Sequence, residues 1–334
     1  MISMCTSIYQ IAIDGTHMLS RTMDWPSLEN APIYLPRNFK WQTRFNHHTY
    51  SNEYAIVGGG NYRGMRANVS DGVNEYGLCG QKLTFANGAR LMSERNADKT
   101  QLAAFEFVLW ALGNCRSVDE LIEKLPQVEL MDDTNSDTKY GYPELHFAFA
   151  DKTGRIVVIE PTQNPMRVID NPLGIVTNSP HFEKQLDRLK KYVEFSPAFL
   201  RGNVPLNTAK VTTGSLSGKS IPPGSYSPGA RFIRAAYFKE RANQPADESE
   251  SLVSSWRLLD GVTVPKNTDH QPTYSVYRSA TTSESRSFYF QAYNQMTVTK
   301  LQLTDNLLKR TTPIMYEVSN QPHVIDLNHS GDLE

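Results

Sequence analysis

Cys5 is the residue whose type and position first indicate chemistry, because it lies near the start of the chain and directly before a β-like run over residues 6–13. If the four preceding residues are removed, Cys5 carries both a thiol and a free α-amine. An α-amine has a pKa of roughly 7.7–8, so at neutral pH it can accept the thiol proton. The thiolate is the reactive form, and one residue then supplies both nucleophile and base. Taken alone, a cysteine at the start of a strand more often serves as a small apolar residue in a buried position.

Other chemical motifs lack the spacing that they need. The glycines at 58–60 and 64 do not form the dinucleotide-binding pattern, because Arg63 replaces a required glycine. Residues 218–220 resemble the end of a phosphate loop, but Thr213 stands where its first glycine belongs. No Gly-x-Ser-x-Gly elbow occurs, and the histidines show no pair at metal-ligand spacing. We therefore expect no metal and no cofactor.

Six segments that span most of the chain together carry a family pattern. They lie at residues 4–7, 19–24, 35–39, 71–78, 174–180 and 227–234. In order and spacing they resemble the choloylglycine hydrolase family, which contains bile salt hydrolases and penicillin V acylases. The resemblance implies an α+β fold, a four-layer αββα sandwich of two antiparallel sheets between helical layers, as in N-terminal-nucleophile hydrolases. It also implies cofactor-free hydrolysis of a linear amide.

The same resemblance assigns five catalytic residues, which are Cys5, Arg21, Asp24, Asn178 and Arg231. Cys5 matches the nucleophile, and the two arginines can favour negative charge because a guanidinium stays ionised. Asp24 can accept a hydrogen bond from the α-ammonium of Cys5. Asn178 can donate to the oxyanion of the tetrahedral intermediate.

Two further positions in matching segments have less defined roles. The backbone N–H of Thr84 is a second candidate oxyanion donor. Asn74 lies in the segment 71–78 without a clear function. Related bile salt hydrolases tend to carry asparagine at position 84, and penicillin V acylases carry tyrosine.

The threonine at position 84 favours a penicillin V acylase over a bile salt hydrolase, which stays the alternative. From another class, a non-catalytic binding protein that kept the fold also stays open. In each case the partner is a small molecule, an acyl amide for the enzymes.

The N-terminus must be processed before Cys5 can use its α-amine. Either the chain cleaves itself after Met4, or Met4 is the true start and residues 1–3 are an extension. We therefore expect residues 1–4 to be removed and residues 5–334 to form one domain.

The expected secondary structure alternates strands with pairs of helices. A turn at Asp14-Gly15 predicts a hairpin. Its strands cover residues 6–13 and 17–21, and further strands are expected at 54–58, 77–85, 145–150, 156–160, 166–169, 287–294 and 296–303. Helices are expected at 102–112, 181–192, 230–242 and 248–259, and Ser117 starts another through residue 125 as part of a capping box. Residues 212–229 are expected to form a long loop.

Composition limits the partners. The net charge is −1 and the basic residues are scattered, which argues against nucleic acid. No apolar run approaches the roughly 18 residues of a membrane-spanning helix. Three cysteines are too few for a disulfide framework, which favours a reducing, cytoplasmic location. The family resemblance implies a homo-oligomer, a homotetramer.

Overall fold

Two large antiparallel sheets dominate the computed structural model, which describes residues 4–27, 29–192, 222–267, 269, 272–319 and 321–326. One sheet has six strands and the other has eight. The first runs in the order β14 (Ile175–Val176), β1 (Met4–Ile11), β2 (His17–Trp25), β15 (Tyr274–Thr282), β16 (Ser287–Ala292) and β17 (Thr299–Gln302). The second runs in the order β13 (Arg167–Asp170), β12 (Ile156–Glu160), β11 (Leu145–Ala150), β8 (Cys79–Thr84), β7 (Arg66–Asn74), β6 (Ile56–Arg63), β3 (Ala31–Leu35) and β18 (Ile314–Met315).

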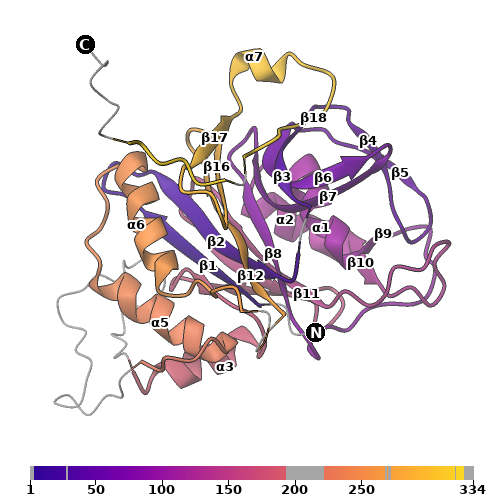
Figure 1. Cartoon of the computed structure of the whole chain (residues 1–334). Helices are drawn as coiled ribbons and strands as arrows, with labels where there is room; N and C mark the ends of the chain where they lie inside the picture. Colours follow the sequence, from indigo (N-terminus) through magenta and orange to yellow (C-terminus); the bar gives the residue numbers. More distant parts are fainter. Residues whose placement is uncertain are drawn as a thin grey trace.

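Helices cover the outer faces of the two sheets (Figure 1). The helices α1 (Phe107–Asn114) and α2 (Val118–Lys124) lie beside the eight-stranded sheet. On the other side, α5 (Pro228–Arg241) and α6 (Glu248–Asp260) pack on β1, and α3 (Phe182–Leu189) packs on α5. This arrangement confirms the predicted αββα sandwich.

Smaller elements complete the described structure. They are the strand pairs β4 (Lys40–Gln42) with β5 (Thr49–Ser51) and β9 (Thr100–Ala103) with β10 (Val128–Met131), the 3₁₀ turns η1 (Ala104–Glu106) and η2 (Leu125–Gln127), and the helix α7 (Asp305–Leu308). No described helix has the length and apolar character needed to cross a membrane.

Apolar side chains fill two separate layers. Between the sheets, Leu19, Val57 and Val73 belong to one buried apolar cluster. Outside the eight-stranded sheet, Phe147 and other apolar residues pack against α1. Because the side chains of a strand alternate between its faces, strands such as β3, β6, β7, β11 and β12 contribute to both layers.

The first hairpin forms as the sequence predicts. The backbone nitrogen of Ala12 donates to the carbonyl of Thr16 at 2.9 Å, and Gly15 has φ +89°, which glycine adopts without steric cost. The resulting register places Cys5 opposite Met23 and Met4 opposite Asp24. The turn at residues 14–15 thus sets which side chains flank the cysteine.

The helix expected at residues 102–112 begins later than predicted. Thr100–Ala103 is the strand β9, which pairs in parallel with β10, and a 3₁₀ turn precedes α1. The pairing with distant residues overrides the helical spacing of Leu102 and Phe105. The next helix is confirmed, since Oγ of Ser117 accepts from the backbone nitrogen of Glu120 at 3.2 Å.

The expected loop at residues 212–229 is only partly tested. Residues 212–221 lie outside the described residues, and α5 already begins at Pro228. The end of that prediction is therefore wrong, because proline is well suited to the first turn of a helix.

Candidate active site

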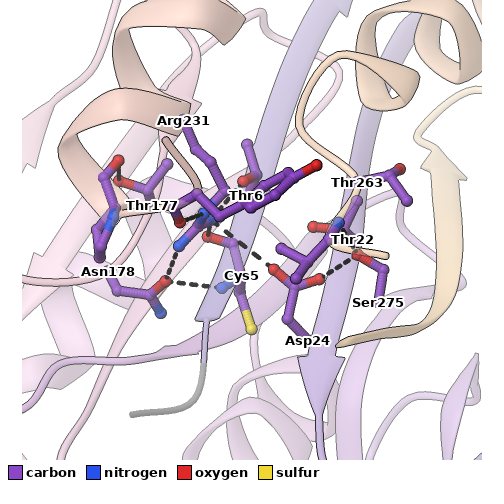
Figure 2. A network of polar contacts seen from close by, with 12 residues as sticks. Cys5, Thr6, Thr22, Asp24, Thr177, Asn178, Arg231, Thr263 and Ser275 are labelled. Atoms are coloured by element: carbon purple, nitrogen blue, oxygen red, sulfur yellow. Dashed lines mark hydrogen bonds and ion pairs between the residues drawn. The ribbon is translucent and has the colours of Figure 1, made fainter. Parts of the chain in front are cut away.

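Cys5 lies on β1 between the two sheets, and only 2% of it is exposed. Its Sγ lies 4.0 Å from Sδ of Met23, the residue opposite it on β2. Figure 2 shows the sulfur pointing away from the guanidinium of Arg231. The backbone nitrogen and carbonyl of Cys5 make the hydrogen bonds that join it to Asn178 and Arg231.

Asn178 follows the short strand β14, which pairs with β1 next to Cys5. Its Oδ1 accepts from the backbone nitrogen of Cys5 at 2.7 Å and from Nη2 of Arg231 at 2.8 Å. Its Nδ2 donates to the carbonyl oxygen of Thr84 at 2.9 Å. Asn178 therefore joins three of the positions that the sequence singled out, and it accepts from Cys5.

Arg231 lies in the first turns of α5, completely buried, and donates to the opposite side of Cys5 (Figure 2). Its Nη1 donates to the carbonyl of Cys5 at 2.5 Å and to Oγ1 of Thr6 at 2.6 Å. Its Nε donates to the carbonyl of Tyr226 at 2.9 Å. Burial lowers the pKa of Arg231, although the charges of Asp24 and Cys5 act against this shift. The guanidinium stays ionised at any working pH.

Asp24 lies at the end of β2, opposite Met4. Its Oδ1 accepts from Oγ of Ser275 at 2.6 Å, and its Oδ2 lies 3.9 Å from Nη1 of Arg231. Burial raises the pKa of the Asp24 carboxyl, while the charge of Arg231 and the hydrogen bond from Ser275 oppose this shift. In the chain that still carries Met4, the nitrogen of Cys5 contacts Asn178 instead of Asp24.

Arg21 reaches from β2 towards the eight-stranded sheet. Its Nη1 donates to the carbonyl of Lys82 at 2.8 Å, and its Nη2 lies 3.4 Å from Sδ of Met23. Burial acts to lower the pKa of Arg21, but the charges of Cys5 and Asp71 outweigh it and raise the pKa. Both predicted arginines are therefore buried on either side of Cys5.

Burial and these cations act in opposite directions on the pKa of the Cys5 thiol. Burial raises the pKa of the thiol, and the charges of Arg21 and Arg231 counter only part of the rise. The thiol is therefore the favoured form as long as Met4 covers the site. Cys79 and Cys115 are also buried, which raises the pKa of each to about 12.

Asn74 does not join this site. Its Nδ2 donates to the carbonyls of Leu112 and Cys115, at 2.8 and 2.7 Å, and its Oδ1 accepts from the backbone nitrogen of Leu78. It therefore ties the turn after β7 to the end of α1.

Within the segment 71–78, the residue near the site is Asp71. Tyr277 donates to its Oδ1 at 2.5 Å and Ser279 donates to its Oδ2. Its charge acts on Arg21. The sequence reasoning missed Asp71, although its place in a matching segment was an available signal.

Ser275, Thr6 and Met23 were also missed. Thr6 and Met23 flank predicted residues in matching segments, whereas Ser275 had no sequence signal. It reaches Asp24 only because β15 pairs with β2.

Comparison with known proteins identifies the family of the chain. The family model for "linear amide C-N hydrolases, choloylglycine hydrolase family" matches residues 5–316. The chain therefore belongs to this family, and it is a linear amide hydrolase.

The similar proteins include bile salt hydrolases and a penicillin V acylase. A "Bile salt hydrolase/transferase" of Clostridium perfringens is 29% identical over 320 residues, which cover 92% of this chain and 96% of that protein. The solved conjugated bile acid hydrolase from Clostridium perfringens superposes with a TM-score of 0.81 at 26% identity, over 97% of this chain and 100% of that one. The penicillin V acylase from Agrobacterium tumefaciens gives a TM-score of 0.68 at 19% identity, over 91% of this chain and 88% of that one. The last similarity supports the fold alone.

Proposed function

We propose that the chain hydrolyses conjugated bile acids, with Cys5 as the N-terminal nucleophile. The observation that carries the proposal is the convergence of Asn178 and Arg231 on the backbone of Cys5, across 173 and 226 positions of sequence. Structural hydrogen bonds to a strand residue do not require two buried polar side chains from separate elements. Such an arrangement fits a residue whose backbone takes part in chemistry.

Removal of residues 1–4 would convert the backbone nitrogen of Cys5 into an α-amine at the place where Oδ1 of Asn178 now lies at 2.7 Å. Asn178 would then hold the amine, while Asp24, opposite Met4, would face the space that Met4 leaves. Loss of Met4 would also admit water to the sulfur. Lower burial would let the charges of Arg21 and Arg231 favour the thiolate.

In the proposed reaction, the α-amine takes the thiol proton and the sulfur attacks the amide carbonyl carbon. The carbonyl π electrons move to oxygen, giving a tetrahedral oxyanion. Its collapse breaks the C–N bond, and the amine leaves with the proton from the α-ammonium. Water then attacks the thioester, and the carboxylic acid leaves with Cys5 restored. This sequence needs no metal or cofactor.

Asn178 and Thr84 are the proposed oxyanion donors. An amide nitrogen carries two hydrogens, and one of those on Nδ2 of Asn178 points to the carbonyl of Thr84. The second hydrogen and the backbone N–H of residue 84 would donate to the oxyanion. A backbone donor tolerates any side chain except proline, so threonine at this position affects specificity more than catalysis.

The comparisons support bile salts over the penicillin substrate that Thr84 alone favoured. A bile salt hydrolase is 29% identical in sequence over 92% of this chain. The penicillin V acylase of similar structure is only 19% identical. Penicillin V therefore becomes the second candidate. The observation in its favour is that position 84 lacks the asparagine that related bile salt hydrolases tend to carry.

The experiment uses protein whose N-terminus is Cys5, with phenoxymethylpenicillin and the glycine and taurine conjugates of cholic acid as substrates. We expect faster release of glycine or taurine than of 6-aminopenicillanic acid. Cys5→Ser should lower the rate by more than about a thousandfold, because it removes the thiolate nucleophile. Preferential penicillin cleavage would reverse the substrate order. Full activity in Cys5→Ser would remove the Cys5 thiolate from the mechanism, and absence of hydrolysis by the parent protein would favour a binding protein.

We also propose a cytoplasmic homo-oligomer, a homotetramer as the family resemblance implies. Light scattering coupled to size-exclusion chromatography tests the assembly. A single species at the mass of four chains supports the proposal, and a monomer contradicts it.

A further inference from the structure

A second cavity, of about 300 Å³, lies beside the β6–β7 hairpin and shares none of its lining residues with the site at Cys5. Three arginines line it, namely Arg44, Arg63 and Arg66, together with the side-chain amides of Asn61 and Asn68. Arginine and amide N–H groups are all hydrogen-bond donors. The cavity therefore offers many donors and a surplus of positive charge.

Two of these arginines make no direct ion pair within the parts of the chain that the structure describes. Arg63 is ion-paired with Glu29 at 2.9 Å on the surface. By contrast, neither Arg44 nor Arg66 has a side-chain hydrogen bond or ion pair with a described residue. Burial and the charge of Arg66 lower the pKa of Arg44. Two like charges are thus held close together beside an open cavity.

The carboxylate of Glu106 lines the same cavity but is already engaged. Its Oε1 accepts from the backbone nitrogen of Arg44 and its Oε2 from that of Ala103, both at 2.9 Å. Burial raises the pKa of Glu106 to about 7. The Glu106 side chain thus fixes the backbone of the cavity wall, and its partial charge at neutral pH cannot balance the charges of both Arg44 and Arg66.

Lys82 on β8 connects the wall of the cavity to the eight-stranded sheet. On β8, Gln81 points towards β1, where its Oε1 accepts from Oγ of Ser7 at 2.7 Å. The next residue, Lys82, points the opposite way, because side chains alternate along a strand. Its Nζ donates to Oδ1 of Asn68, which lines the cavity, and to the carbonyl of Phe105 at 2.9 Å. Lys82 thereby fixes the side chain of Asn68 in the cavity wall.

We propose that this cavity is a second ligand site, separate from the amide-cleaving site, and that it binds a small organic anion with a carboxylate or sulfonate group. Arginine side chains bind such groups through pairs of parallel N–H bonds. Ligand pockets start at roughly 300 Å³, so the cavity suits a molecule of a few carbon atoms. The ring of Phe105 and the methyl group of Ala67 offer apolar contacts for those carbons.

The test measures binding of sodium ethanesulfonate and sodium acetate to the full chain by calorimetry, at constant ionic strength. We expect saturable binding of at least one probe, which Arg44→Gln/Arg66→Gln weakens by at least about tenfold, because hydrogen bonds to charged groups are lost. Arg257→Gln is the matched control, since it removes a charge from an arginine on α6 that is 80% exposed. It should leave the affinity unchanged.

Three outcomes would overturn the proposal. These are no binding of either probe, equal affinity in the double variant, and an equal loss in Arg257→Gln. If the double variant does not fold, Arg66→Gln alone is compared with the same control.

A second measurement separates this site from the substrate site. The KM for taurine- and glycine-conjugated cholic acid should be the same in the double variant and the parent. A higher KM for either conjugate in the double variant would place the cavity in the substrate site and contradict the proposed separation.

Discussion

The backbone nitrogen of Cys5 donates to Oδ1 of Asn178 at 2.7 Å, and the same oxygen accepts from Nη2 of Arg231 at 2.8 Å. Because a guanidinium can only donate, Arg231 fixes which end of the amide faces Cys5. Nδ2 must then point the other way, to the carbonyl of Thr84. One side chain therefore holds the future α-amine with its oxygen and presents its donors at the place where an oxyanion is expected.

Substitution of Asn178 should test its role as an oxyanion donor. Asn178→Asp keeps an oxygen for Cys5 and Arg231 but offers no N–H, and Asn178→Ala removes both. We expect both variants to lose about 10²- to 10³-fold in kcat, the usual effect of losing one oxyanion donor. Steady-state kinetics on the best substrate measures this loss. Activity near that of the parent in Asn178→Asp would exclude donation by Asn178.

Arg231 should be important for stability as well as for catalysis. Its guanidinium is completely buried and makes hydrogen bonds to Cys5, Thr6, Asn178 and Tyr226. Arg231→Gln leaves acceptors without donors and Asp24 without its cation, which we expect to lower the free energy of unfolding by about 3–5 kcal/mol.

Urea denaturation measures the stability of Arg231→Gln against that of Arg257→Gln, a surface arginine. The control should stay within about 0.5 kcal/mol of the parent. A loss of less than about 0.5 kcal/mol in Arg231→Gln would show that other contacts replace the hydrogen bonds of Arg231.

Processing of the N-terminus should switch on the reactivity of Cys5. Protein that begins at Cys5 is expected to react with iodoacetamide at this residue much faster than protein that keeps Met4, because Met4 is only 8% exposed and helps to bury the thiol. Intact mass identifies the two forms, and peptide mapping identifies the alkylated cysteine. The buried Cys79 serves as the internal control. Equal alkylation rates at Cys5 in both forms would contradict the role of processing.

Acid should destabilise the fold through His146. Nε2 of this buried ring donates to the carbonyl of Thr177 at 2.7 Å, directly before Asn178, and burial lowers the pKa of His146 to about 4. The unfolded chain, with the ordinary histidine pKa near 6.5, therefore binds more protons between pH 6.5 and 4. The stability of the fold is complete above that range and falls as the pH falls through it, by about 3 kcal/mol for this residue.

His146→Gln is the variant that tests this prediction, because its amide can still donate to Thr177 but does not titrate. Urea denaturation at pH 7.5, 5.5 and 4.5 compares it with the parent. As the pH falls, the free energy of unfolding of the parent should decrease more than that of His146→Gln. A difference that stays constant with pH would assign acid sensitivity to other groups.

The sequence predicted elements that local chemistry decides. Asp14-Gly15 determines the first hairpin, since glycine tolerates the positive φ of the turn. Ser117 determines the start of α2 through its own hydroxyl. Strands such as β11 and β12 were predicted with correct bounds because their apolar residues are contiguous and a turn joins them.

Two central strands were missed, β7 and β15, because their buried positions are polar. On β15, the side chains of Ser275 and Ser279 lie in the interior, where Asp24 and Asp71 satisfy them. No local pattern shows such partners, which are about 200 residues or more away. The helix expected from residue 102 was wrong for the same kind of reason, since the partner strand β10 is distant in sequence.

The sequence by itself determined the family and the sandwich fold, because residue types and their order along the chain carry that information. It also predicted the site residues Cys5, Arg21, Asp24, Asn178 and Arg231. Only the tertiary structure decided how they meet. It placed Asn178 as an acceptor for Cys5. It placed Asp71 beside Arg21, while Asn74 contacts the end of α1. It also brought Arg44 and Arg66 together at a second cavity. Hydrogen bonds and charges depend on distance in space, and that distance is set by strand pairing and packing across hundreds of residues.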